Sequence, residues 1–357
     1  MSDTIVVRSM FREYRIEFGD DAVGVVRARL DPEKTFVVCD ARVHALYAEY
    51  LAPLLVPGRH MLVAPSEDSK TIDKAQEIIE AMVVTGVRRD HTAVAIGGGI
   101  TQDVTAFAAS ILYRGINWAF IPTTLLAQTD SCLGSKTSIN VKDKKNLAGN
   151  FWPPAFAIID PRFLDTLSED EVRSGVGEIL HFLMYADSPM LVPLLTGIPG
   201  FLADRRTLRP FIDEALRIKQ GVAEIDEFDQ HERHKFNFGH TFGHALESTT
   251  DYAIPHGLAV TVGVDIACFV SSRLGLMPTA LFERLHPLFA HNFPARRFTM
   301  DQFDRYCQYL TKDKKNIGRD VGCILAERPG ALVAKRLPLD GGLRDLLREY
   351  FEGPYWR

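Results

Sequence analysis

Cysteine is scarce in this sequence and lacks the spacing that would make it informative. The 357 residues include five cysteines, Cys39, Cys132, Cys268, Cys307 and Cys323. They are odd in number, lie far apart and never form a C-x-x-C pair. We therefore expect reduced thiols, mostly in the core, and no disulfide framework.

Long apolar runs and excess positive charge are also missing. No run approaches the roughly 18 apolar residues that a membrane span needs, and Met1-Ser2-Asp3-Thr4 is not a basic region leading into an apolar one. The net charge of −5 provides no general attraction for nucleic acid or an anionic membrane. We expect a cytoplasmic protein with neither partner, in which any binding site for an anion is built from locally gathered basic residues.

What is present is typical of a globular protein with two domains, since 46% of the residues are hydrophobic and 24% are charged. In the first part, short apolar runs alternate with helical patterns, which favours a Rossmann-like, mainly parallel sheet with helical crossovers. The predicted strands are 35–39, 61–64, 92–96, 118–121 and 155–159, preceded by a hairpin of 4–7 and 14–18.

After Asp160-Pro161 helical periods dominate and strand signals almost vanish. We therefore predict an α/β domain over residues 1–160 and an all-helical domain over 161–357. Ser168 and Glu171 fit a capping box that starts a helix containing Glu178. Residues 193–206 are rich in turn formers, which indicates a surface excursion.

Three adjacent glycines, Gly97, Gly98 and Gly99, follow a buried-strand pattern and open a helix. Such a turn lets the backbone approach a pyrophosphate, and the helix N-terminus supplies unpaired N–H donors. A phosphate or dinucleotide ligand is the functional interpretation; an ordinary tight turn is the alternative, because the pattern is not G-x-G-x-x-G.

Histidines cluster in NFGHTFGHALESTTDYAIPHGLAV. His240 and His244 are one helical turn apart and share a face, and His256 follows closely, which suggests a site for zinc or a similar metal. Hydrogen-bonded core histidines are the alternative. Glu178 is the best distant carboxylate, because an unpaired charge among its apolar neighbours would be costly; a solvent-facing helical glutamate is the alternative.

A basic group provides donors for a phosphate, although each member alone is typical of a solvated surface charge. The basic residues are Lys136, Lys145, Lys219, Arg233, Lys314 and Lys315, and Asn146, which follows Lys145, adds an amide donor.

In a series of strings the chain resembles the 3-dehydroquinate synthases and related sugar phosphate cyclases. The strings keep the family's order over nearly the whole chain: SEDSK, GGGITQD, YRG, PTTLLAQTDS, GSKTSIN, KKNLAGNFWPP, GEIL, NFGHTFGHALE, PHG and DKKN. The resemblance implies an N-terminal NAD-binding domain, a C-terminal helical metal-binding domain and a homodimer.

The resemblance also implies the ligands of each cofactor. A divalent metal, zinc or cobalt, would be held by Glu178, His240 and His256, so that His244 would face the substrate phosphate instead. NAD would lie across the glycine turn, in contact with Asp40, Glu67, Lys70, Gly97, Gly98, Gly99, Asp103, Thr123, Thr124 and Lys145.

The implied substrate is a heptulose 7-phosphate, with 3-deoxy-arabino-heptulosonate 7-phosphate as the first choice. It would lose phosphate and close to a carbocycle, with NAD recycled rather than consumed. By resemblance the phosphate contacts would be Lys136, Asn146, Asn237, His244, one of Lys314 and Lys315, and Arg114 from a neighbouring subunit. Carboxylate and hydroxyl contacts would be Asp130, Lys219 and Arg233.

Three positions depart from the family pattern. His181 stands where a lysine that contacts a substrate hydroxyl is usual, Asp229 replaces a glutamate, and Leu258 replaces the glutamate after the His-Gly pair. A cyclase acting on sedoheptulose 7-phosphate, such as a valiolone-type synthase, therefore stays an alternative. A metal-dependent polyol or glycerol phosphate dehydrogenase and a noncatalytic binding protein are two further alternatives.

Overall fold

The computed structural model describes residues 3–142, 144–311 and 320–356. The chain forms two compact units, Met1–Leu167 with Lys219–Phe228, and Ser168–Ile218 with Asp229–Arg357. The expected division into residues 1–160 and 161–357 therefore differs from the observed units, because a short segment returns to the first one. Glu224 and Glu227 of that segment accept hydrogen bonds from the backbone N–H groups of Arg8 and Met10, a pairing across more than 200 residues that no local pattern reveals.

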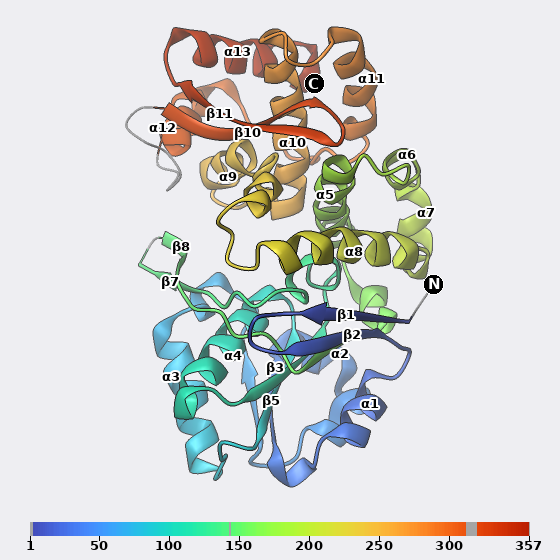
Figure 1. Ribbon diagram of the computed structural model, residues 1–357, viewed down its shortest axis with the longest axis vertical. Helices are drawn as coiled ribbons and strands as arrows, with labels where there is room; N and C mark the ends of the chain where they lie inside the picture. The colour runs from blue at the N-terminus through green and yellow to red at the C-terminus, as the bar shows by residue number, and fades with distance from the viewer. Residues whose placement is uncertain (1–2, 143, 312–319, 357) are drawn as a thin grey trace. The chain divides into compact units, whose positions relative to one another are not determined.

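The first unit is organised by a seven-stranded sheet of order β1-β2-β9-β6-β5-β3-β4 (Figure 1). β1 and β2 form an antiparallel hairpin, and the other neighbours are parallel. The predicted mainly parallel sheet and its hairpin are thus confirmed. The strands are β1 (Thr4–Arg8), β2 (Glu13–Phe18), β3 (Thr35–Asp40), β4 (His60–Val63), β5 (Thr92–Gly97), β6 (Asn117–Pro122) and β9 (Phe156–Ile159).

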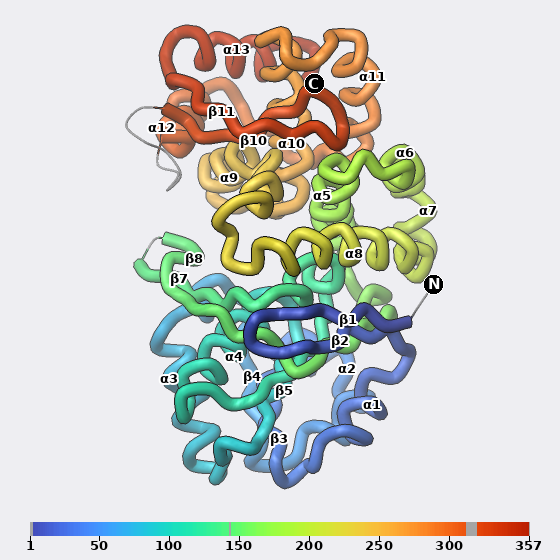
Figure 2. The backbone as a smooth tube through the Cα atoms, viewed as in Figure 1, coloured from blue at the N-terminus to red at the C-terminus, as the bar shows by residue number. Residues whose placement is uncertain are grey.

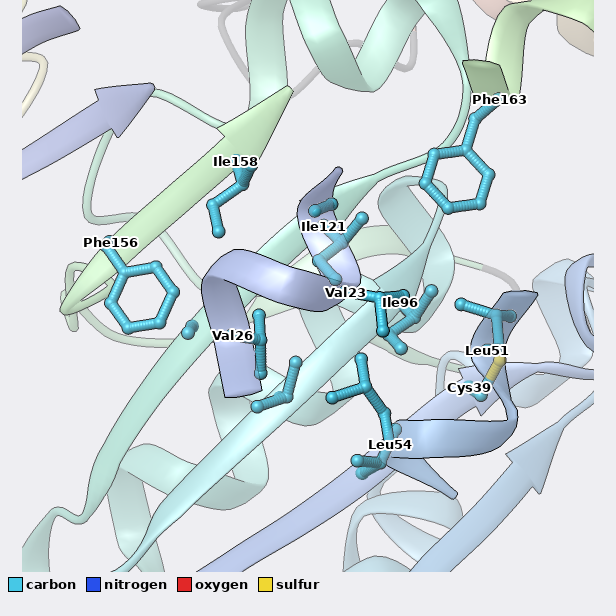
Figure 3. Close-up of a cluster of buried hydrophobic side chains, with 14 residues drawn as sticks. Val23, Val26, Cys39, Leu51, Leu54, Ile96, Ile121, Phe156, Ile158 and Phe163 are labelled. Carbon is cyan, nitrogen blue, oxygen red and sulfur yellow. The ribbon is translucent and has the colours of Figure 1, made fainter. Parts of the chain in front are cut away.

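Helices connect the parallel strands, as the alternating pattern predicts. They are α1 (Ala22–Arg29), α2 (Ala41–Leu51), α3 (Ile72–Val84) and α4 (Gly99–Ile111). β3 and β5 are buried at every position, as expected for strands covered on both faces. On one face, Val26 of α1 and Leu51 of α2 pack with Ile96, Ile121 and other strand residues (Figure 3).

Two features of the first unit are absent from the sequence predictions. A small antiparallel hairpin joins β7 (Ile139–Val141) to β8 (Lys144–Ala148). A π-helix, Ala127–Ser131, follows β6 and contains Asp130. π-helical turns are rare and often occur at functional sites.

The second unit is mainly helical, as predicted. Its helices are the first part of α8 (Arg209–Ile225, which runs on into the first unit), α5 (Glu169–Ala186), α6 (Leu191–Thr196), α7 (Ile198–Ala203), α9 (His240–Thr249), α10 (His256–Arg273), α11 (Thr279–Ala290), α12 (Phe303–Thr311) and α13 (Gly341–Glu352) (Figure 2). The predicted capping box of Ser168 and Glu171 starts α5.

Two expectations for the second unit are wrong. Residues 193–206 are not simply a surface excursion, because α6 and α7 occupy much of this stretch and bury Leu194, Leu195 and Ile198. A β-hairpin of β10 (Asp320–Arg328) and β11 (Ala331–Pro338) stands where strand signals were considered nearly absent.

The cysteine prediction is confirmed, because all five thiols are free and buried. In the described ranges, no helix combines the length and the apolar character that crossing a lipid bilayer requires.

Candidate functional site

Two helices of the second unit cross at a pair of glycines. A Cβ added to Gly177 of α5 would lie 1.9 Å from the carbonyl oxygen of Gly257 in α10, and one added to Gly257 would lie 1.7 Å from that of Ser174. Only glycine permits such an approach of two backbones. Glu178 follows the first glycine and His256 precedes the second, so the crossing brings these two side chains together.

A second close crossing joins α9 to α10. A Cβ on Gly263 would lie 1.9 Å from the carbonyl oxygen of Gly239, the residue before His240. The donor nitrogens of His240, His244 and His256 consequently all lie within 4.8 Å of one another. The shared face expected for the H-x-x-x-H pair is visible in the 5.4 Å separation of the His240 and His244 ring centroids.

The carboxylate of Glu178 lies next to two of these histidines. Its two carboxylate oxygens lie 3.7 Å from His240 Nε2 and 3.6 Å from His256 Nε2. The side chain is only 4% exposed, and Oε2 has no hydrogen-bond partner among the described residues. A buried carboxylate oxygen facing two imidazoles is a donor set that suits zinc or cobalt, so the residues fit a divalent metal.

The electrostatics at this point favour a positive charge. Burial by itself raises the pKa of the Glu178 carboxyl, but His181, His256 and His240 outweigh it and hold that pKa below its usual range. Burial likewise lowers the pKa of His256, yet the carboxylates of Glu247 and Glu178 reverse this and raise the His256 pKa well above its usual value. A bound cation would replace the proton that these carboxylates attract.

Glu247 is a functional residue that the sequence reasoning missed. Its Oε2 lies 3.1 Å from His256 Nδ1 and holds the ring so that Nε2 faces Glu178. Carboxylates that orient a ligand imidazole in this way are common around metals. The signal was its place in the string NFGHTFGHALE, one turn after His244.

His181 is buried beside the same carboxylate. Its Nδ1 lies 3.5 Å from Glu178 Oε1, and its ring centroid lies 5.0 Å from that of His240. The ring packs against Phe182 and Phe236. At the position where the family resemblance leads one to expect a lysine, this chain therefore has a compact side chain beside Glu178.

The glycine turn of the first unit has the geometry of a phosphate-binding turn. Gly97 ends β5 and Gly98 precedes α4, and a Cβ on Gly97 would come within 3.1 Å of Asp40 Cβ. No side chain in the described ranges caps the N-terminus of α4 or lies within 4 Å of a Cβ on Gly99. This leaves N–H donors without a side-chain cap and room at the helix N-terminus.

Two threonines lie at the neighbouring strand end. Thr123 follows β6, its backbone N–H donates to Gly97 O, and its buried hydroxyl has no hydrogen-bond partner in the part of the chain that is described. Thr124 Oγ1 accepts from Ala127 N, which begins the π-helix. Asp40 caps α2 by accepting from Arg42 N.

The remaining residues expected at NAD form one polar network. Lys70 Nζ lies 2.5 Å from an Asp103 carboxylate oxygen and 2.5 Å from Asn146 Oδ1. Lys145 Nζ lies 3.4 Å from Glu67 Oε2. Burial raises the pKa of the Asp103 carboxyl, and the Lys70 ammonium partly offsets this rise. For Glu67, burial also raises the pKa, but Asn140, Lys145 and Lys70 turn the net shift downward.

Two expected substrate contacts pair with each other. Lys219 Nζ donates to Asp130 Oδ1 at 2.7 Å and to the Asp130 carbonyl oxygen at 2.6 Å. Lys219 is buried and lies in the segment that returns to the first unit. Gln102 Nε2 donates to the carbonyl oxygen of Ser131 at 2.6 Å, which fixes the π-helix next to Asp130.

The other expected site residues are placed separately. Lys136 and Arg114 are exposed, and Arg114 has a left-handed φ of 63°. Arg233 is buried and Asn237 is half-buried, both in the 3₁₀ helix Glu232–Asn237 that precedes α9. Lys314 and Lys315 lie outside the described residues.

Sequence-family models match most of the chain. Residues 60–174 match the model described as 3-dehydroquinate synthase N-terminal, and residues 175–316 match the one described as 3-dehydroquinate synthase C-terminal. A 3-dehydroquinate synthase of Thermoanaerobacter pseudethanolicus is 34% identical over 296 residues, which cover 80% of this chain and 83% of the relative.

Two solved structures have a similar fold. A 2-deoxy-scyllo-inosose synthase complexed with carbaglucose-6-phosphate, NAD⁺ and Co²⁺ has a TM-score of 0.84 at 24% identity, covering 98% of this chain and 100% of that one. A 2-epi-5-epi-valiolone synthase from Streptomyces hygroscopicus subsp. jinggangensis with NAD⁺ and Zn²⁺ bound has a TM-score of 0.82 at 24% identity, covering 95% and 96%. With family models over both halves and a relative above 30% identity along most of its length, the chain belongs to the 3-dehydroquinate synthase family.

Proposed function

We propose that the protein is an NAD- and divalent-metal-dependent sugar phosphate cyclase that acts as a 3-dehydroquinate synthase in the shikimate pathway. The observation that carries the proposal is the buried Glu178 carboxylate facing His240 and His256. Family membership supports the reaction and its heptulose 7-phosphate substrate. The cofactors named for the two similar structures, NAD⁺ with Co²⁺ or Zn²⁺, support the cofactors.

Each cofactor has a set of residues that fits it. Glu178, His240 and His256 would hold the metal, and the glycine turn with the network around Lys70 would hold NAD. When bound, NAD accepts and returns a hydride and the metal polarises the substrate hydroxyl that is oxidised, so there is no net redox change.

The proposed substrate contacts rest on the family resemblance and on charge. His244, exposed beside the metal group, would bind the phosphate with Lys136, Asn146 and Asn237. Lys314 and Lys315 are the remaining residues that we propose as contacts of the substrate phosphate. The Lys219 ammonium, fixed by Asp130, and the buried guanidinium of Arg233 would bind carboxylate and hydroxyl oxygens.

We also propose the reaction class, the oligomeric state and the location of the enzyme. Loss of phosphate with cleavage of a carbon–oxygen bond makes the enzyme a lyase. A homodimer would bring Arg114 into the neighbouring subunit's site, and its exposed position on a left-handed turn suits that role. We also propose that the enzyme works in the cytoplasm.

The alternatives are not favoured. The curated relatives at 31–34% identity are 3-dehydroquinate synthases, whereas the valiolone-type synthase is similar at 24% identity, which supports the fold alone. A dehydrogenase would release reduced cofactor in each turnover, which a cyclase of this family does not.

Product analysis tests the proposal. The zinc-loaded protein is incubated with NAD⁺ and either 3-deoxy-arabino-heptulosonate 7-phosphate or sedoheptulose 7-phosphate, with phosphate release, absorbance at 340 nm and product mass followed together. We expect phosphate and a carbocycle from the first substrate, without NADH accumulation. Stoichiometric NADH would reject the cyclase, a product from sedoheptulose 7-phosphate alone would reject the assigned substrate, and no phosphate release from metal-replete protein would favour a binding protein.

A further inference from the structure

We propose that Asn140 is a positioning residue that joins the turn Glu67–Ser69, expected at NAD, to the β7–β8 hairpin that carries the expected phosphate contact Asn146, so that one amide sets the affinity for both ligands. The inference rests on the proposed function for the identity of the two ligands. It gives a role to a residue that lies in the string GSKTSIN but had none assigned, and it explains how two neighbouring subsites keep a fixed separation.

The hairpin of β7 and β8 is irregular where Asn140 lies. Ile139 pairs with Ala148 and Val141 pairs with Lys144, so β8 has two more residues than β7 between these pairs. Such a bulge leaves backbone groups unpaired and re-aims side chains. Asn146 lies inside it with a left-handed φ of 53°, and its backbone N–H donates to Asn140 Oδ1 at 3.0 Å.

The other polar groups of Asn140 reach the turn Glu67–Ser69 and the residue after it. Its Nδ2 donates to Glu67 Oε1 at 2.8 Å, and its backbone N–H donates to Lys70 O at 2.7 Å. Lys70 Nζ in turn donates to Asn146 Oδ1 at 2.5 Å. A closed ring of hydrogen bonds therefore links Glu67, Lys70 and Asn146 through Asn140.

Asparagine suits this position, and neither an ionised aspartate nor an alanine does. The side chain must donate to a carboxylate and accept from an N–H at the same time, which Asn does and neither Asp nor Ala can do. An aspartate would place a second carboxylate against Glu67, and an alanine would leave the Asn146 N–H and the Glu67 carboxylate without this partner. Because hydrogen bonds to charged groups are among the stronger ones, the loss should be large.

Binding of NAD⁺ by calorimetry, and KM and kcat for the heptulose 7-phosphate at saturating NAD⁺, test the inference. We expect Asn140→Ala to weaken NAD⁺ binding and to raise KM, each by about tenfold or more, with kcat within about threefold of the unsubstituted enzyme. A contribution to folding alone would not produce this split between KM and kcat. Asn117→Asp is the matched control, because Asn117 Oδ1 accepts from Arg12 Nη1 at the start of β6 and Asn117 is not part of the Asn140 ring; both constants should stay unchanged.

A double-mutant cycle with Glu67 isolates the proposed contact. Asn140→Asp should weaken NAD⁺ binding at least about tenfold in the unsubstituted chain but by less than about threefold in the Glu67→Gln background, where a glutamine amide donates to the new carboxylate. Equal losses in the two backgrounds, or an Asn140→Ala variant with unchanged NAD⁺ affinity and KM, would overturn the inference. If Asn140→Asp alone does not fold, a folded double variant that binds NAD⁺ like Glu67→Gln supports it and a nonbinding one refutes it. Failure of the unsubstituted protein to bind NAD⁺ would instead refute the proposed function.

Discussion

The glycine crossing of α5 and α10 gives a quantitative prediction for the metal group. In Gly177→Ala the new methyl carbon would lie 1.9 Å from the carbonyl oxygen of Gly257, which is backbone and cannot rotate away. Carbon and oxygen need roughly 3.3 Å, so the two helices must separate by about 1.4 Å. Metal–ligand distances tolerate only about 0.2 Å.

The separation acts directly on the ligands, because Glu178 follows Gly177 in the chain and His256 precedes Gly257. We expect zinc affinity to fall by at least about 10–100-fold, the range seen when the supports of metal ligands are removed. Overpacking of this kind should also lower the free energy of unfolding by about 1–3 kcal/mol. Both effects have one cause and should appear together.

Equilibrium dialysis against Zn²⁺ measures the affinity, and urea denaturation measures stability. Gly221→Ala is the control, since Gly221 lies in α8 and, its own helical turn aside, no described atom lies within 4 Å of an added Cβ. That variant should keep full metal affinity and gain about 0.5–1 kcal/mol from the better helix former. A folded Gly177→Ala protein that binds zinc as tightly as the unsubstituted one would show that the crossing does not set the ligand geometry.

Three further predictions concern other groups. His256→Ala should remove most of the metal measured by elemental analysis, whereas His244→Ala should retain it and raise KM for the phosphorylated substrate; equal metal retention contradicts the assigned roles. Burial raises the pKa of Asp265, so its proton is held in the folded state after the unfolded chain has released it, and stability falls as pH rises from the ordinary aspartate pKa toward the raised value. Asp265→Asn should therefore flatten that slope in urea titrations, and an unchanged slope argues against a protonated Asp265. Burial raises the pKa of all five thiols, so a disulfide reagent should label them at least about 100-fold faster after unfolding; fast labelling of the native protein would contradict the buried core.

Local sequence patterns predicted the strands and helices in which the spacing of apolar residues matches their burial in the fold. Strands β3, β5 and β6 read as apolar runs because helices cover both faces of the sheet. The β10–β11 hairpin was missed although Gly330, with a left-handed φ of 75°, marks its turn. β11, the more exposed strand of the hairpin, carries charged residues, so its pattern does not stand out as a strand among the surrounding helical patterns. Residues 193–206 form helices despite their turn formers, because proline is well tolerated in the first turn of a helix such as α7.

The candidate site likewise contains some features that local patterns predict and others that they do not. The spacing of His240 and His244 revealed a shared face, because helical periodicity is local. The pairing of Lys219 with Asp130 spans 89 residues, and the contact of His256 with Glu247 depends on the bend between two helices. Residue types alone do not encode such contacts. The resemblance placed Lys219 and Asp130 separately at the substrate without pairing them, and Glu247 was present only as part of the string NFGHTFGHALE.

Adjacency between glycine and ligand is the common feature of the metal group. Glu178 follows Gly177, His240 follows Gly239 and His256 precedes Gly257, and Gly177, Gly239 and Gly257 all take part in close backbone contacts between helices. Side chains placed by direct backbone packing have little freedom, so the ligand positions are fixed before a metal binds and less side-chain entropy is lost on binding. Substitutions at these glycines should accordingly be as damaging to metal binding as substitutions at the ligands themselves, even though no glycine contacts the ion.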